Sequence, residues 1–123
     1  MATPEIKANN MYQLLREERI DEFNRLREEG HDVDLVNCDL RGVDLRGLNA
    51  KGLDMSGCYF RQANLRGIDF SETRLEGASI NGAKISGALF PSDLSADEIT
   101  LSVVHGTRMR YQKTLIVKAK SKV

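Results

Sequence analysis

"GVDLRGLNAKGLDMSG", residues 42–57, is the stretch of sequence that decides the fold. It places a glycine at every fifth position and an apolar residue three positions after each glycine. A helix repeats about every 3.6 residues and a strand about every second residue, so neither element produces this period. A backbone corner at every fifth residue explains the glycines, because corners favour residues that lack a side chain or adopt a positive φ.

The five-residue period extends over residues 33–92 and forms two columns of apolar residues. One column lies at the centre of each repeat, and the other lies two residues before it. Of these 24 positions, 23 are apolar in a chain that is 41% hydrophobic overall, so both columns are predicted to face a core. The twelve central residues are Leu35, Leu40, Leu45, Ala50, Met55, Phe60, Leu65, Phe70, Leu75, Ile80, Ile85 and Phe90.

Four sides of five residues close a square, so the twelve repeats make about three coils. Neighbouring coils are expected to stack at the strand spacing of about 4.7–4.9 Å, with parallel pairing of their backbone groups. Repeats that contact only their neighbours form a solenoid. The sequence therefore predicts a mainly β fold, a quadrilateral parallel β-helix.

Several repeats resemble a known family. "VDLRG" (residues 43–47), "ANLRG" (63–67) and "IDFSE" (68–72) are similar to the pentapeptide-repeat family, whose pattern is a small residue, Asp or Asn, Leu or Phe, a variable residue and Gly. The chain resembles a small bacterial member of this family, and the resemblance covers residues 33–92. It implies that the β-helix is right-handed. The repeats depart from the family pattern at Ala50, Asn37, Gln62, Glu72, Tyr59, Arg74 and Lys84.

Residues 1–32 are predicted to form a helical cap, because an open end of the coils would expose the core. Asn9 or Asn10 can begin a helix, and Ile20 marks a fresh helix start. We expect one broken helix or a tight pair of helices that ends at Gly30. The residues expected on their apolar face are Met11, Tyr12, Leu15, Phe23 and Leu26.

Residues 93–106 are predicted to form a second helical cap at the other end of the coils. Ser95 and Glu98 have the spacing of a capping box, and Gly106 is a candidate C-cap residue. The side chains expected to cover the last coil are Ile99, Leu101, Val103 and Val104.

The overall charge is balanced, with 18 basic and 18 acidic residues. This balance disfavours a wholly basic nucleic-acid binder and a wholly acidic mimic of nucleic acid. The first ten residues lack the features of a secretory leader, and no apolar run nears the roughly 20 residues that span a bilayer. We therefore expect a cytoplasmic protein without a membrane span.

The reactive residue types have structural explanations. Cys38 and Cys58 share an inward column one coil apart, which suits buried reduced thiols better than a disulfide or a metal site. His31 and His105 fall at opposite ends of the coils. We therefore predict no catalytic residue, no metal site and no cofactor, and hence no enzyme. The repeat residues expected to act as corner hydrogen bonders are Asp34, Asp39, Asp44, Asn49, Asp54, Asn64 and Asp69.

Five outward bases follow the centres of their repeats. Stacking places two pairs of them in adjacent coils, where like charges about 5 Å apart repel unless acids or a bound anion lie between them. Two interpretations stay open: a solvated face that is paired internally with Asp39 and Asp44, or a binding face for an acidic protein surface. These five bases, called the basic flank below, are Arg41, Arg46, Lys51, Arg61 and Arg66.

Residues 107–123 are predicted to be a basic tail. Such a segment is either solvated or ordered by a partner, with its apolar run pairing with a strand edge or with a second copy of this chain. The resemblance implies a homodimer as well, because members of the family often dimerise through a C-terminal end. The apolar run of the tail makes such a homodimer plausible here. The candidate contact residues of the tail are Lys113, Leu115, Ile116, Val117, Lys118 and Lys120.

These features predict a non-enzymatic module or scaffold that presents a rigid surface to another protein. The resemblance implies an alternative, because some family members mimic duplex DNA and bind type II topoisomerases. That activity needs an acidic column, whereas the basic flank has the opposite sign.

Overall fold

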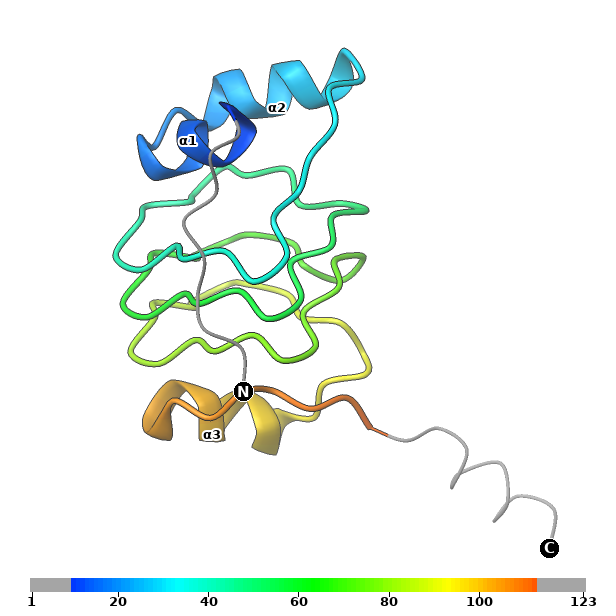
Figure 1. Ribbon diagram of the computed structural model, residues 1–123. Helices are drawn as coiled ribbons and strands as arrows, with labels where there is room; N and C mark the ends of the chain where they lie inside the picture. Colours follow the sequence, from blue (N-terminus) through cyan, green and yellow to red (C-terminus); the bar gives the residue numbers. More distant parts are fainter. Residues whose placement is uncertain (1–9, 113–123) are drawn as a thin grey trace, which may run out of the picture.

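The computed structural model describes residues 10–112. Two short helices, α1 (Asn10–Arg16) and α2 (Ile20–Glu28), lie at one end of a stack of coils. Helix α3 (Ala96–His105) lies at the opposite end (Figure 1). The predicted helix pair is therefore present near the N-terminus, and a single helix follows the coils.

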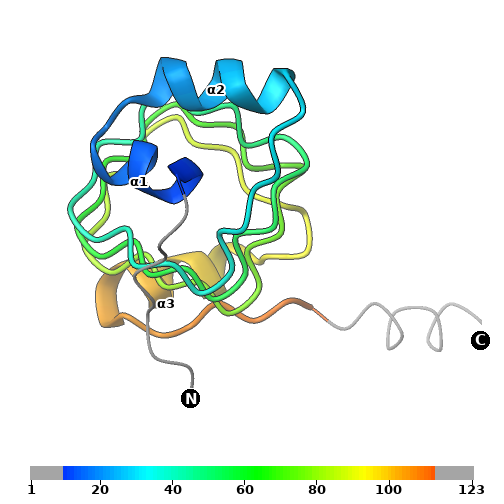
Figure 2. The same cartoon turned by 45° about the horizontal axis from the view of Figure 1, so that its top comes forward.

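The coils stack with a repeat of twenty residues. Viewed obliquely from the end that carries α1 and α2, they superpose in a four-sided outline (Figure 2). Isolated parallel bridges hold them in register, and each bridge joins two residues twenty positions apart. The bridged pairs are Asp39 with Tyr59, Asp44 with Asn64, Asp54 with Arg74, Tyr59 with Ser79, Asn64 with Lys84, and Asp69 with Leu89.

The fold prediction was wrong in its class. Residues 10–112 contain isolated bridges and helices, and they contain no β-strand and no sheet, so a mainly β helix does not describe them. The repeat itself explains this difference, because a strand needs several successive extended residues that pair with a neighbour. A corner at every fifth residue leaves one bridged residue on a side.

Residues 63–67 show how one repeat satisfies its five amides. Ala63 N donates to Phe60 O across the corner at 2.9 Å. Asn64 N donates to the preceding coil, whereas Leu65 N and Gly67 N donate to the following coil. Arg66 N donates to the side chain of Asn64 at 3.3 Å, which is the corner role predicted for the Asp and Asn residues. Every amide in this repeat has a partner without a strand.

The two apolar columns face the interior, as predicted. Cys38 and Ala78 are fully buried in one column, and Phe60 and Phe70 in the other. The rings of Phe60 and Phe70 have centroids 6.4 Å apart, and those of Phe70 and Phe90 are 6.0 Å apart in successive coils. The core is therefore continuous along the stack.

Polar side chains of the helix pair continue the hydrogen bonding of the first coil. The hydroxyl of Tyr12 donates to Asp39 O at 2.6 Å, and the carboxylate of Glu18 accepts from Asp44 N at 2.7 Å. Asn24 donates to Gly47 O and accepts from Asn49 N, each at 3.0 Å. These side chains therefore supply the hydrogen bonds that the backbone of a preceding coil would otherwise make to the first coil.

Helix α3 has the predicted ends. The hydroxyl of Ser95 accepts from Glu98 N, and Gly106 adopts the left-handed conformation at the C-cap. The expected covering face was only half right, because Leu101 and Val104 are 39% and 60% exposed. Ser102 is the fully buried residue, and its hydroxyl accepts from Ile80 N and donates to Thr107 O. A polar residue thus joins this helix to the coils.

Residues 107–112 pack against the coils, although the sequence assigned them to a basic tail. Met109 is fully buried and exchanges backbone hydrogen bonds with Gly77 and Ala78, at 2.7 and 2.8 Å. A guanidinium nitrogen of Arg108 donates to Gly77 O, and the hydroxyl of Tyr111 accepts from Leu75 N at 2.9 Å. We call residues 107–112 the strap.

The corner residue Gly42 tests the conformational requirement of the repeat. Its φ is +70°, and an added Cβ would meet no atom within 4 Å, so only backbone strain opposes Gly42→Ala. We expect a loss of about 1 kcal/mol in the free energy of unfolding, measured by urea denaturation. Gln62→Gly, at the next corner in the column (φ +59°), should be neutral or stabilising by up to about 1 kcal/mol. A neutral Gly42→Ala would contradict this account.

Candidate functional site

The basic flank occupies neighbouring sides of the coil stack, and its five side chains are exposed. Gly42 N donates to Arg61 O at 2.8 Å, which places Arg41 beside Arg61 in successive coils. The bridge between Asp44 and Asn64 gives Arg46 and Arg66 the same register. The predicted stacking of these arginines is therefore present.

Arg41 is held by a buried carboxylate and an aromatic ring. Its Nε and Nη2 donate to both oxygens of Asp39, with the shortest distance 2.6 Å. Its guanidinium carbon lies 5.5 Å from the ring centroid of Tyr59, in the next coil. Hydrogen bonding from Arg41 holds the pKa of Asp39 below its usual value. Asp39 is therefore the counter-ion of Arg41, which is the internal pairing that one of the two open interpretations expects.

Asp39→Asn should reduce stability at neutral pH by about 1–2 kcal/mol, because it removes a charge-assisted hydrogen bond from a buried group. The folded pKa of Asp39 is depressed, so its contribution is complete above the unfolded pKa of about 3.9 and disappears as the pH falls through the folded value. Urea denaturation at pH 7 and at pH 2.5 should show the difference between the variant and the wild type shrinking. An equal difference at both values would contradict this assignment.

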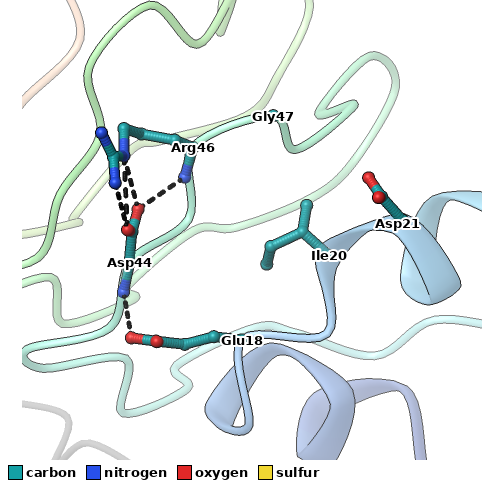
Figure 3. Close-up of a pocket in the computed structure, with 6 residues that line it drawn as sticks. All are labelled: Glu18, Ile20, Asp21, Asp44, Arg46 and Gly47. Atoms are coloured by element: carbon teal, nitrogen blue, oxygen red, sulfur yellow. Dashed lines mark hydrogen bonds and ion pairs between the residues drawn. The ribbon is translucent and has the colours of Figure 1, made fainter.

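The surroundings of Arg46 are acidic. Its Nε and Nη2 donate to Asp44, whose own backbone N donates to Glu18 (Figure 3). Asp21, from the first turn of α2, lines the same open pocket of 510 Å³. The lining of this pocket thus includes three carboxylates and one guanidinium, which give it a formal charge of −2. The flank is therefore not uniformly basic.

The other members of the flank differ in their partners. Lys51 Nζ lies 4.0 Å from a carboxylate oxygen of Glu72, which is a long and exposed ion pair. Within residues 10–112, the side chains of Arg61 and Arg66 form no hydrogen bond and no ion pair. Free donors on the flank are therefore concentrated in the second coil.

Arg16 joins the flank from outside the repeats, and sequence analysis missed it. This last residue of α1 donates through Nη1 to Arg41 O at 2.9 Å. Together with Arg41 and Arg61 it lines an open pocket of 430 Å³, whose other lining residues are Asp39, Gly42 and Gln62. No repeat signal identifies Arg16, because its position depends on how α1 packs on the first coil.

The cysteines and histidines have the places expected of them. Cys38 and Cys58 are buried and free, and burial raises the pKa of the Cys58 thiol well above its usual value. His31 and His105 are exposed at opposite ends of the stack. Residues 10–112 contain no group of three or more His, Cys, Asp or Glu side chains arranged to bind a metal.

The candidate residues of the tail lie outside the described part of the chain. These residues are Lys113, Leu115, Ile116, Val117, Lys118 and Lys120. Among residues 10–112, none of the helices reaches the length and apolarity that crossing a bilayer requires.

Comparison with known proteins identifies the repeats. The family model described as pentapeptide repeats matches residues 31–62 and 54–90, in eight copies. Comparisons of the chain with curated proteins and with solved structures give no significant match.

Proposed function

Because the chain is a pentapeptide-repeat protein over residues 31–90, we propose that it is a non-enzymatic interaction module whose basic flank binds an acidic surface of a partner protein. The observation that carries this proposal is the state of the stacked arginines. Arg41 and Arg46 are fixed by pairs with Asp39 and Asp44, whereas the side chains of Arg61 and Arg66 form no hydrogen bond or ion pair with the rest of residues 10–112.

Preorganisation is the proposed source of affinity. Ordering a long, flexible side chain on binding costs about 0.5–1.5 kcal/mol. The two-point hydrogen bonds of Arg41 to Asp39 impose that order before a partner arrives. Arg41 still has a third guanidinium nitrogen, Nη1, for an acidic group of a partner. The side chain of Arg61, which has no hydrogen bond or ion pair within the described residues 10–112, lies in the next coil.

The topoisomerase-binding alternative gains no support from these surfaces. A mimic of duplex DNA needs rows of negative charge along the coils, whereas successive coils here place Arg41 beside Arg61 and Arg46 beside Arg66. We therefore do not propose that activity.

The test is quantitative affinity purification from a native lysate with the full chain as bait. One bait has Arg41, Arg46, Arg61 and Arg66 all changed to Ser, and a matched bait has Arg19, Arg25, Arg74 and Arg110 changed to Ser. We expect the first change to remove most specific partners and the second to retain them. If the first bait keeps its partners, the flank is not the binding surface.

A homodimer through the C-terminal segment and a cytoplasmic location stay predictions. Sedimentation of the full chain beside a version that stops after Gln112 would test the dimer, because this truncation keeps the whole strap. A dimer that survives the truncation would assign assembly to another surface.

A further inference from the structure

The pocket between Arg16, Arg41 and Arg61 carries a surplus of positive charge. Of the part of the chain that the structure describes, Asp39 is the one carboxylate that lines this pocket, so its three guanidinium groups leave a formal charge of +2. The neighbouring pocket around Arg46 has the opposite balance of −2. The surplus is therefore local to one corner of the stack.

Several guanidinium donors of these three arginines have no acceptor within residues 10–112. Arg16 uses Nη1 on Arg41 O, which leaves Nε and Nη2. Arg41 uses Nε and Nη2 on Asp39, which leaves Nη1. The side chain of Arg61 forms no bond with residues 10–112. Three arginines with such donors, contributed by α1 and by two successive coils, thus line a single open pocket.

A single carboxylate matches this arrangement poorly. It carries one charge and two oxygens in one plane, and one guanidinium satisfies it, as Arg41 does for Asp39. A phosphoryl group carries about −1.5 to −2 charge near neutral pH and presents three acceptor oxygens. Its charge equals the local surplus, and its oxygens can accept from three directions.

We propose that this pocket binds a phosphorylated side chain of the partner protein. The proposal rests on the proposed function and names the group that the partner presents. Arg41 and Arg16 form the ordered side of the site, and Arg61 closes on the phosphoryl group from the next coil.

The charge of the neighbouring pocket favours a phosphoprotein over a nucleic acid. A polyanion follows an extended row of cations and gains affinity from each phosphate that it neutralises. On the adjacent side, Glu18, Asp21 and Asp44 line one pocket together with Arg46, so a phosphate next along a strand would meet net negative charge. A single phosphoryl group on a protein surface avoids this repulsion.

The chain provides a matched pair of variants. Arg61 and Arg25 are both exposed, and Arg25 lies on α2, outside the basic flank. Of these two residues, Arg61 alone lines the positive pocket. Arg61→Ser and Arg25→Ser therefore remove the same charge, and circular dichroism checks that both variants are folded.

The probe is a fluorescein-labelled peptide with one phosphoserine in a neutral sequence, titrated by fluorescence polarisation. The same peptide with serine or glutamate, inorganic phosphate, and a single-stranded DNA oligonucleotide serve as comparisons. We expect the phosphopeptide to bind the full chain at least about ten-fold more tightly than the other two peptides and the free phosphate. Arg61→Ser should weaken it about ten-fold, and Arg25→Ser less than about two-fold.

Equal losses in the two variants would overturn the proposal, as would equal binding of the glutamate peptide or tighter binding of the oligonucleotide. These outcomes are separable from failure of the proposed function. The four-serine bait can lose its partners while Arg61→Ser leaves the affinity for the phosphopeptide unchanged. In that case the proposed phosphoryl site is wrong, and the proposed interaction module is retained. If that bait keeps its partners, the proposed function itself fails.

Discussion

Phe70→Ala should lower the free energy of unfolding by about 3–5 kcal/mol. The ring is fully buried in the middle of the stack and contacts Phe60 and Phe90, with centroids 6.4 and 6.0 Å away. Its removal leaves a cavity that the coils cannot close, because each coil is held to its neighbours by backbone hydrogen bonds on all sides. Urea denaturation followed by circular dichroism measures the loss.

Leu89→Ala is the matched control for Phe70→Ala. Leu89 is paired with Asp69 in the coil bridge, yet its side chain is 57% exposed. Its truncation should cost no more than about 0.5–1 kcal/mol. Similar losses in the two variants would show that the centres do not form the main core.

Met109→Ala should cost about 2–4 kcal/mol, although the sequence placed this residue in a basic tail. Met109 is fully buried, and its backbone pairs with Gly77 and Ala78. Loss of its side chain removes apolar contact at the point where the strap closes the last coil. The same denaturation measurement applies.

Arg110→Ser is the matched control within the strap. Its side chain is 79% exposed and pairs with Glu98, so its removal should cost less than about 1 kcal/mol. If Met109→Ala were no more harmful than Arg110→Ser, the strap would not contribute to the folded body.

Much of the fold could be predicted from local patterns. The centres and the residues two before them are buried through most of the stack, and the corner glycines have positive φ. Asn37 and Gln62, which depart from glycine, adopt the same left-handed conformation, whereas Glu72 does not, so the repeat imposes its corner geometry at two of these three departures. The helix ends at Ser95 and Gly106 also follow from neighbouring residues.

Local sequence patterns did not predict the class of the fold or the residues that the N-terminal segment contributes to the site. The prediction of strands assumed that parallel pairing implies extended segments, whereas the corners limit pairing to isolated bridges. The prediction of a basic flank considered only charges along the repeats. It missed Arg16, Glu18 and Asp21, which arrive from the helix pair and divide the flank into a positive pocket and a negative one.

The sequence by itself determined which side chains face inward, where the chain turns and which residues begin and end α3, because each depends on residues within one repeat or one helical turn. Only the tertiary structure decided the charge of each pocket and the place of the strap. Those depend on contacts between segments more than twenty residues apart, such as Arg16 with Arg41 and Met109 with Ala78. The five-residue pattern contains no information about such contacts, because each of them involves a residue that lies outside the repeats.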